Sequence, residues 1–343
     1  MPTTLVTGGA GFIGSHFVEL LFARCPDERI IVLDAFTYAA HPDNIPAAIA
    51  DSGRFRLLQG DIRDPDMVEF AVAQADRVVH FAAESHVTRS IADDRAFFET
   101  DVMGTHTIAA AVARNRARIR RFVHISTSEV YGTSIGGAMD ENHPLNPCTP
   151  YAAAKAGADR LVYAYEVTYG LPVVIIRPFN NYGPRQHLEK CVPRFITAAL
   201  DGQPLTVHGT GRASRDWLHV TDCCEGIFRA LAAPDETVVG QVINLGTGTH
   251  TSVREIAARI CEHTGRDRSL VTHTSERPGQ VDCHLANIDK ARRLLDWQPR
   301  VKLADGLAVT VRWYDENRAW WAGQKQFAEI SVSDPVRRLH GSY

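Results

Sequence analysis

The residues with the clearest chemical potential are Tyr151 and Lys155, which stand four positions apart in a segment of helical character. Residues at this spacing lie on one face of a helix, so the ammonium group can act on the phenol. A neighbouring positive charge lowers the pKa of a phenol, and a phenolate tuned in this way can remove a proton from a hydroxyl group. The pair therefore predicts acid–base chemistry at an alcohol, although a surface tyrosine beside an exposed lysine is the usual explanation of this common spacing.

A polar cluster that includes Thr127, Ser128 and Glu129 directly follows a predicted strand at 121–125. Polar side chains at the carboxyl end of a strand in a parallel sheet lie at the edge where ligands bind. We therefore expect these three residues to share one catalytic site with the Tyr–Lys pair.

Glycines at three-residue spacing, Gly8, Gly11 and Gly14, lie between a predicted strand at 4–7 and a predicted helix at 15–23. Such glycines let the backbone approach a pyrophosphate, whose charge then lies at the helix N-terminus. A glycine triplet alone can also serve only tight packing of a helix on a strand. The position of this one between a strand and a helix favours a dinucleotide site.

An acidic residue, Asp34, ends the second predicted strand at 29–34, about 20 residues beyond the glycine turn. A carboxylate there accepts hydrogen bonds from ribose hydroxyls and repels a 2′-phosphate, which favours NAD over NADP. A helix N-cap is the alternative role for this residue. The residues expected to contact the cofactor are Gly8, Gly11, Phe12, Ile13, Gly14, Asp34, Asp61, Ile62, Ala82, Ala83, Ser85, Tyr151 and Lys155.

Strands of the buried type recur along the first half of the chain, and helical segments separate most of them. The predicted strands are 4–7, 29–34, 55–58, 76–81, 121–125 and 173–176, and helices are predicted later at 253–264, 289–295 and 306–321. The alternation of strands and helices predicts an α/β fold with a Rossmann-type, doubly wound, mostly parallel sheet.

The composition is typical of a soluble globular protein, with 45% hydrophobic and 22% charged residues in a chain of 343. A formal net charge of -3 gives no electrostatic reason to expect nucleic acid or membrane partners. We expect no signal peptide and no membrane-spanning segment. The seven cysteines are scattered without a CxxC motif, and the 15 histidines include no HExxH motif, so we expect reduced thiols, a cytoplasmic protein and no metal site.

Three further motifs carry a family resemblance: HFAAESHV at 80–87, NNYGPRQ at 180–186 and WLHV at 217–220. With them, the chain from residue 4 to about residue 321 resembles the extended short-chain dehydrogenase/reductase superfamily. Within that superfamily it is similar to the nucleotide-sugar dehydratases, decarboxylases and epimerases, and overall most similar to the dTDP-glucose 4,6-dehydratases.

The resemblance implies bound NAD, Tyr151 as the base at the sugar C4 hydroxyl, Lys155 as its electrostatic partner and Thr127 as a hydrogen-bonding partner of the sugar. Oxidation at C4 acidifies the C5 proton, which Glu129 would remove. The residues implied to bind the nucleotide sugar are Ser85, Thr127, Asn180, Lys190, Leu205, Val207, Arg215, Asn244, Arg277 and His284.

The resemblance also implies a smaller α/β substrate-binding domain. We expect residues 1–178 to form the NAD-binding domain, to which parts of 212–245 return, residues 179–325 to form mainly the substrate-binding domain, and residues 326–343 to form a C-terminal tail. A homodimer is implied as well, through a four-helix contact that includes the helix around Tyr151.

One residue departs from the dehydratase pattern, because Ser128 stands where that pattern has an aspartic acid that protonates the departing C6 hydroxyl. A serine hydroxyl is too weak an acid to replace it well. The Ser-Glu pair resembles the UDP-glucuronate decarboxylases, in which serine can donate a hydrogen bond to the C6 carboxylate. His284 aligns with the decarboxylase arginine that neutralises this carboxylate, and histidine supplies only partial charge near neutral pH. GDP-mannose 4,6-dehydratases also carry a Ser-Glu pair.

We therefore predict an NAD-dependent enzyme that oxidises C4 of a nucleotide hexose and decarboxylates UDP-glucuronate to UDP-xylose or a UDP-4-keto-pentose. Dehydration of dTDP-glucose is the alternative, and 4-epimerisation is the third reading. A dinucleotide-sensing protein without turnover is disfavoured because Thr127, Glu129, Tyr151 and Lys155 are all present.

Overall fold

The structure is a computed structural model that describes residues 1–324. The tail predicted at 326–343 lies outside the described residues. No helix among residues 1–324 is both long enough and apolar enough to cross a membrane.

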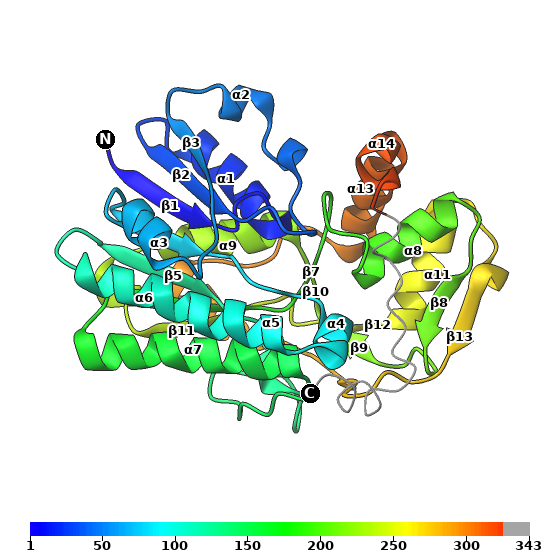
Figure 1. The fold of residues 1–343 in the computed structure, drawn as a ribbon. Coiled ribbons are helices and arrows are strands. Elements are labelled where there is room, and N and C mark those ends of the chain that lie inside the picture. The colour runs from blue at the N-terminus through cyan, green and yellow to red at the C-terminus, as the bar shows by residue number, and fades with distance from the viewer. Residues whose placement is uncertain (325–343) are drawn as a thin grey trace, which may run out of the picture.

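A seven-stranded parallel sheet forms the larger part of the molecule, with the strand order β11-β6-β5-β4-β1-β2-β3 (Figure 1). Its strands are β1 (Thr3–Thr7), β2 (Arg29–Asp34), β3 (Phe55–Gln59), β4 (Arg77–His80), β5 (Arg121–Ile125), β6 (Val173–Pro178) and β11 (Gln241–Leu245). Every neighbouring pair runs parallel. The predicted Rossmann-type, doubly wound sheet is therefore confirmed.

Helices cover both faces of this sheet, which explains why its strands are apolar on both sides. On one face α1 (Phe12–Arg24) packs against α9 (Val220–Ala232), and on the other lie α3 (Pro65–Val72), α6 (Thr105–Arg114) and α7 (Pro150–Tyr169). Successive residues of β1 enter different cores: Val6 joins the cluster with Phe17, and Leu5 joins the cluster with Val68 and Ile108.

The smaller part of the molecule lies beyond the carboxyl ends of the strands (Figure 1). Its main elements are α8 (Cys191–Leu200), β8 (Leu205–His208), α11 (Val253–His263), β13 (Val271–Thr274), α13 (Leu303–Glu316) and α14 (Arg318–Ala322). Strands β8 and β13 pair in parallel, and a third hydrophobic cluster fills the space between them and the helices.

Short elements connect these layers. Two small sheets pair β7 (Asn180–Tyr182) with β10 (Trp217–His219) and β9 (Ser214–Arg215) with β12 (Thr251–Ser252). The remaining elements are η1 (Pro42–Asn44), α2 (Ala47–Ala50), α4 (Val87–Ala92), α5 (Arg95–Phe97), the π-helix η2 (Phe98–Gly104), η3 (Ser128–Tyr131), α10 (Asp235–Val238), η4 (Arg268–Leu270) and α12 (Asp289–Leu295).

The predicted single helix at 306–321 is wrong, because α13 ends at Glu316 and α14 starts at Arg318. Asn317 separates them with a non-helical ψ of 42°. Its side-chain amide donates to the Trp313 carbonyl at 2.8 Å, and its backbone nitrogen donates to the same oxygen at 2.9 Å, so Asn317 caps the first helix.

Candidate active site

A cavity of about 560 Å³ lies at the carboxyl edge of the large sheet, between it and the smaller part of the molecule. Most of the residues predicted for cofactor and substrate line it. They are Gly8, Gly11, Phe12, Ile13, Gly14, Asp34, Asp61, Ile62, Ala82, Ala83, Ser85, Thr127, Ser128, Glu129, Tyr151, Lys155, Asn180, Lys190, Arg215 and Arg277. The structure thus brings the glycine turn, the Tyr–Lys pair and the Ser-Glu pair into one space.

The glycine turn is packed so closely that side chains would not fit. Gly8 has a φ of +69°, and a Cβ added there would lie 2.6 Å from the Ala82 nitrogen. A Cβ on Gly14 would lie 2.2 Å from the Gly8 carbonyl oxygen. The bare backbone and the start of α1 therefore form a surface that a pyrophosphate can approach, so these residues fit a dinucleotide.

Asp34 lies at the end of β2 and is only 7% exposed. Its Oδ2 accepts a hydrogen bond from the Ala10 nitrogen and its Oδ1 accepts one from the Phe36 nitrogen, both at 2.9 Å. Burial raises the pKa of this carboxyl, while the two backbone hydrogen bonds oppose the rise. Asp34 thus braces the glycine turn from the cavity wall, and each oxygen keeps a lone pair for a ribose hydroxyl.

Tyr151 and Lys155 lie in the first turns of α7. Thr149 caps this helix by accepting a hydrogen bond from the Ala152 nitrogen at 3.3 Å, and Pro150 occupies the first helical position. The Lys155 ammonium is buried and donates to the Ile125 carbonyl oxygen at 2.8 Å. The cap and this bond fix both side chains against the end of β5.

The surroundings of the Tyr151 phenol favour its protonated form. The pKa of Tyr151 is raised, chiefly by burial, and the charges of Asp101 and Glu129 add to the rise, while a hydrogen bond with Thr127 opposes it. Burial lowers the pKa of Lys155 against the effect of Asp101. Burial and the carboxylates around the phenol therefore both oppose formation of the phenolate.

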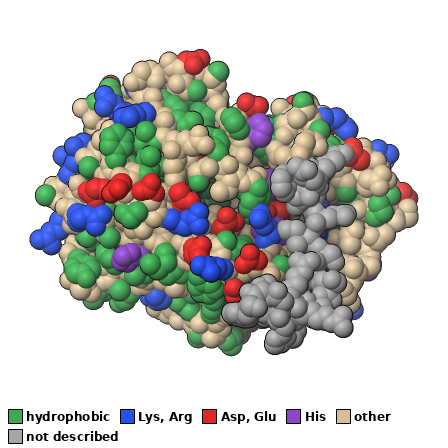
Figure 2. Space-filling view, in the orientation of Figure 1, with side chains coloured by type: hydrophobic (Ala, Val, Ile, Leu, Met, Phe, Trp, Pro, Cys, Tyr) green, Lys and Arg blue, Asp and Glu red, His purple; other side chains and the backbone are tan. Residues whose placement is uncertain are grey.

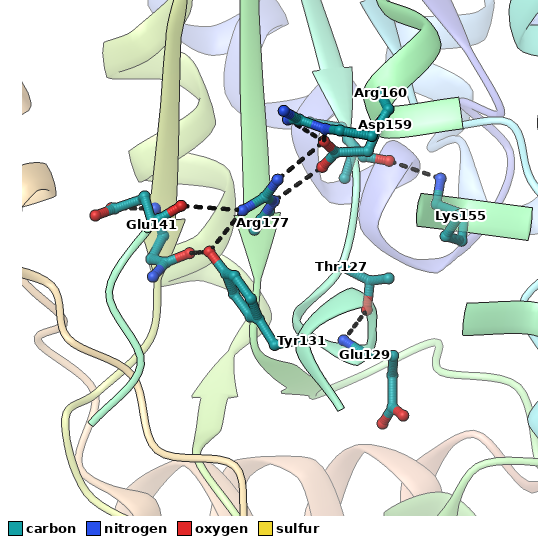
Figure 3. Close-up of polar contacts among 10 residues, drawn as sticks. Thr127, Glu129, Tyr131, Glu141, Lys155, Asp159, Arg160 and Arg177 are labelled. Atoms are coloured by element: carbon teal, nitrogen blue, oxygen red, sulfur yellow. Dashed lines mark hydrogen bonds and ion pairs between the residues drawn. The ribbon is translucent and has the colours of Figure 1, made fainter. Parts of the chain in front are cut away.

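Glu129 lies in η3, directly after β5, and its backbone nitrogen donates to Thr127 Oγ1 at 3.2 Å (Figure 3). Burial raises the pKa of its carboxyl, but the positive charges of His284, Arg215 and Arg277 outweigh burial and hold the pKa below its usual value. Glu129 is therefore an anion near neutral pH and can accept a proton.

Ser128 points from the same short helix toward His284, which is fully buried. The Ser128 Oγ lies 3.2 Å from His284 Nδ1, and His284 Nε2 lies 3.0 Å from the Gly132 carbonyl oxygen. Burial lowers the pKa of His284 to about 4, although the charge of Glu129 raises it. His284 therefore lies behind Ser128 as a neutral imidazole and does not line the cavity.

Basic side chains line the other end of the cavity. Arg215 and Arg277 come from the smaller part of the molecule, and Lys190 precedes α8. Lys190 donates to the Ser85 carbonyl oxygen and lies 3.5 Å from Glu189. Guanidinium and ammonium donors suit the oxygens of a diphosphate.

Three residues predicted to bind the nucleotide do not line the cavity. Leu205 and Val207 are fully buried in the third hydrophobic cluster. Asn244 is fully buried, where its Oδ1 accepts from the Tyr131 hydroxyl at 2.8 Å and its Nδ2 donates to the Met139 carbonyl at 3.0 Å. Leu205 and Val207 lie on the buried face of β8, since side chains alternate between the two faces of a strand. The Asn244 amide is buried because its hydrogen bonds are made within the protein.

Several cavity residues were missed by sequence reasoning, although Glu84 and His86 lie inside a quoted motif. His86 Nε2 lies 3.8 Å from the buried carboxylate of Glu189, which also lines the cavity. Asp101, in the π-helix, does not line the cavity but accepts from the Glu84 nitrogen at 2.7 Å, and burial raises its pKa to about 7. Its sequence signal is weak, because the same segment also carries Glu99.

A buried ion pair holds the site's framework together (Figure 3). Arg177 of β6 donates two hydrogen bonds to Asp159 of α7, each at 2.9 Å, and a third to the Tyr131 hydroxyl of η3. The pair is almost inaccessible, with side-chain exposures of 2% and 0%. It ties together the helix that carries Tyr151, the short helix that carries Glu129 and the sheet.

Comparison with known proteins places these features in one family. The family described as GDP-mannose 4,6 dehydratase matches residues 5–310. A dTDP-glucose 4,6-dehydratase from Streptomyces niveus is 46% identical over 333 residues, which cover 96% of this chain and 97% of that protein. A dTDP-glucose 4,6-dehydratase from an Actinoplanes species is 42% identical, covering 92% of this chain and 99% of that protein.

A solved structure is similarly close. DesIV, a dTDP-glucose 4,6-dehydratase from Streptomyces venezuelae solved with NAD and TYD bound, has a TM-score of 0.89 and 44% identity. The match covers 94% of this chain and 99% of that chain. The expectation of NAD agrees with the cofactor in that structure.

The prediction of UDP-glucuronate decarboxylation is wrong. The relatives at 46% and 42% identity are dTDP-glucose 4,6-dehydratases. The structure gives the physical reason, because His284 is neutral and lies behind Ser128, where it cannot neutralise a carboxylate as an arginine would. The matching family, the relatives and the shared fold show that this chain belongs to the GDP-mannose 4,6-dehydratase family of extended short-chain dehydrogenases/reductases.

Proposed function

We propose that this protein is an NAD-dependent dTDP-glucose 4,6-dehydratase, a lyase of carbohydrate biosynthesis. The observation that carries the proposal is that Thr127, Glu129, Tyr151 and Lys155 line one cavity with the glycine turn. The nucleotide is chosen because the relatives described above act on dTDP-glucose.

The glycine turn, the N-terminus of α1 and Asp34 would hold NAD in this proposal. When bound, NAD would accept a hydride from C4, return it to C6, and supply a positive ring charge that makes the phenolate of Tyr151 less costly.

In the proposed reaction, Tyr151 takes the proton of the sugar C4 hydroxyl, and Thr127 positions that hydroxyl. The hydrogen bond between Tyr151 and Thr127 opposes the rise in the pKa of the phenol. Lys155, fixed by the Ile125 carbonyl, supplies positive charge beside the same site. The resulting C4 ketone acidifies the C5 proton, and Glu129, an anion near neutral pH, accepts it.

The basic end of the cavity would bind the diphosphate. The charges of Arg215 and Arg277 also lower the pKa of Glu129, so a diphosphate bound by these arginines would lie close to the catalytic residues. We propose that residues 179–325 serve mainly as the substrate-binding domain and residues 1–178 as the NAD-binding domain. The seven unpaired cysteines suit a reducing compartment, and we propose a cytoplasmic enzyme.

A homodimer is also proposed, through α7 and its neighbours. Tyr163 and Val167 are four residues apart on α7 and are 42% and 63% exposed, and Met103 of η2 is 57% exposed. Figure 2 shows hydrophobic side chains in the lower left of the view, where Figure 1 places α6 and α7. An exposed apolar helix face of this kind is typical of a subunit contact.

The test is to incubate the purified protein with dTDP-glucose and, in parallel, with UDP-glucose and GDP-mannose, and to read product masses. We expect dTDP-glucose to lose one water and the other two to react more slowly. Faster dehydration of UDP-glucose or GDP-mannose would reassign the nucleotide, and absence of dehydration with all three would refute the proposed activity.

A further inference from the structure

The residue at position 128 creates a chemical problem for dehydration, because the departing C6 hydroxyl needs a proton. Ser128 lines the cavity beside Glu129, but an isolated serine hydroxyl is a weak acid. The structure places one titratable group directly behind it, since His284 Nδ1 lies 3.2 Å from Ser128 Oγ. His284 is fully buried and packs edge-on against Phe179.

The hydrogen bonds of His284 fix its tautomer. The Gly132 carbonyl oxygen can only accept, so the His284 Nε2 that lies 3.0 Å from it carries the proton. The neutral imidazole then has a lone pair on Nδ1, and the Ser128 hydroxyl donates its proton to that nitrogen. In this state Ser128 has no proton to offer the cavity.

Protonation of His284 would reverse this hydrogen bond. With a proton on Nδ1, the imidazolium still donates to Gly132 through Nε2 and now donates to Ser128 Oγ through Nδ1. The Ser128 hydroxyl proton is then free to turn toward the cavity. A source of this proton is close, because Glu129 Oε1 lies 3.9 Å from His284 Nδ1.

We propose that Glu129, His284 and Ser128 relay one proton from C5 of the sugar to the departing C6 oxygen. The C5–H bond breaks, its electrons form the C5–C6 double bond, and the proton passes to Glu129 and then to His284 Nδ1. The imidazolium gives its proton to Ser128 Oγ as Ser128 gives its own to the C6 oxygen. The C6–O bond breaks with its electrons on oxygen, and water leaves. Protons balance without an external acid.

The proton affinities of the two carriers suit this transfer. The pKa of His284 is lowered to about 4, chiefly by burial, and the pKa of Glu129 is held below its usual value near 4.3. Neither group therefore holds a proton strongly, so neither retains it against the next step. Ser128 touches the substrate in this scheme and is catalytic, whereas His284 acts through it and is a positioning residue. The inference rests on the proposed dehydratase function.

The test compares His284→Gln, Ser128→Ala and their combination in the full-length protein with NAD and dTDP-glucose. Glutamine can accept from Ser128 and donate to Gly132, but it cannot hold a proton at neutral pH. We expect each variant to oxidise C4 and accumulate bound NADH, seen by its absorbance, while water loss slows about 10²-fold or more. The combined variant should be no slower than either single one, since both break the same relay.

A second variant restores the acid that Ser128 replaces. Ser128→Asp introduced into His284→Gln should recover water loss to within about tenfold of the wild type, because a carboxylic acid at position 128 needs no histidine behind it. His250→Gln is the matched control, since His250 Nδ1 also lies 2.8 Å from a serine hydroxyl, that of Ser214, but does not line the cavity. It should keep wild-type kinetics.

Three results would overturn the relay: unchanged water loss in His284→Gln, slower turnover without NADH accumulation, or no recovery by Ser128→Asp. The second result would mean that His284 has only a structural role. A wild-type protein that forms neither NADH nor dehydrated product would refute the proposed function itself, and the relay with it. Melting temperatures of all variants separate a folding defect from these outcomes.

Discussion

Tyr151 illustrates how one residue's chemistry depends on what surrounds it. Its hydroxyl is hydrogen-bonded to Thr127 and feels the charges of Asp101, Glu129 and Glu189, so its pKa is raised. As a phenol it can hold a hydrogen bond to an incoming hydroxyl, and further positive charge in the cavity would lower its pKa and favour proton removal. This arrangement would couple proton removal to occupancy of the cofactor site.

Tyr151→Phe should therefore abolish C4 oxidation while NAD still binds. Loss of a general base reduces a rate by about 10² to 10⁴-fold, and the glycine turn is unaffected by removal of one oxygen. NADH formation on adding dTDP-glucose measures the rate, and calorimetric titration measures NAD binding. Tyr169→Phe, at the exposed end of the same helix, is the control and should react normally. Turnover unchanged in Tyr151→Phe would exclude this base.

At the scale of single residues, the sequence predicted which side chains lie together better than it predicted their roles. It brought Ser128 and His284 into one hypothesis, and they are hydrogen-bonded. It assigned His284 to a carboxylate because residue type alone does not reveal complete burial or the Gly132 carbonyl that fixes the tautomer. The prediction that Asn244 binds the nucleotide failed for a similar reason. The sequence does not distinguish a buried asparagine with two hydrogen-bond partners in the protein from one that binds a ligand.

At the scale of elements, the turn between β1 and α1 depends on the absence of side chains. Gly14→Ala should weaken NAD binding about tenfold or more, because its Cβ would lie 2.2 Å from the Gly8 carbonyl and displace the turn. Overpacking of this kind costs about 1–3 kcal/mol. Calorimetric titration with NAD checks it. Gly53→Ala, with no atom within 4 Å of its Cβ, should bind NAD normally, and equal affinity in both variants would contradict this role for the turn.

The Arg177–Asp159 pair should carry much of the attachment of α7 to β6. Asp159→Asn leaves the Arg177 charge buried and uncompensated, which costs about 3–5 kcal/mol of unfolding free energy. Urea titration measures this loss. Arg292→Ala, which removes an exposed ion pair with Asp289, is the control and should change stability by less than about 1 kcal/mol.

The same pair predicts a direction of pH dependence. The charge and hydrogen bonds of Arg177 overcome burial and hold the pKa of Asp159 below its ordinary value. Its contribution is therefore complete above the unfolded pKa near 3.9 and is lost as the pH falls from there toward the folded pKa. Melting temperatures of wild type and Asp159→Asn should converge in acid, and a constant difference down to pH 2 would contradict the assignment.

Most strands of the large sheet were predictable because they are buried on both faces, whereas β11 was not predicted. The predicted ranges 29–34 and 121–125 agree with β2 and β5, which are buried along almost their whole length. The break at Asn317 was not predictable, because the apolar spacing of helical segments continues across it. Placement of Leu205 and Val207 also failed, as a four-residue strand reveals its alternation but not which side faces a ligand.

At the scale of the whole molecule, the layer of α6 and α7 lies on the outside of the sheet and presents apolar side chains that the other residues of the described range 1–324 leave exposed. In a dimer with two-fold symmetry both copies use the same surface patch. Two copies that meet through this layer would therefore bury Val167 against the same patch of the second copy. Each copy's Tyr151 is carried by the same helix, so the contact would also stiffen the helix that positions the base.

Val167→Glu should therefore convert a dimer into a monomer. Two glutamates brought into one apolar contact must lose water without a partner, and their like charges repel. Sedimentation velocity at micromolar concentration measures the change as a halving of mass. Val309→Glu on α13, where the valine is 49% exposed, is the control and should remain dimeric. If wild type and Val167→Glu sediment alike, the subunit contact does not use this face, and α7 must be held in position by the Arg177–Asp159 pair and its own packing on the sheet.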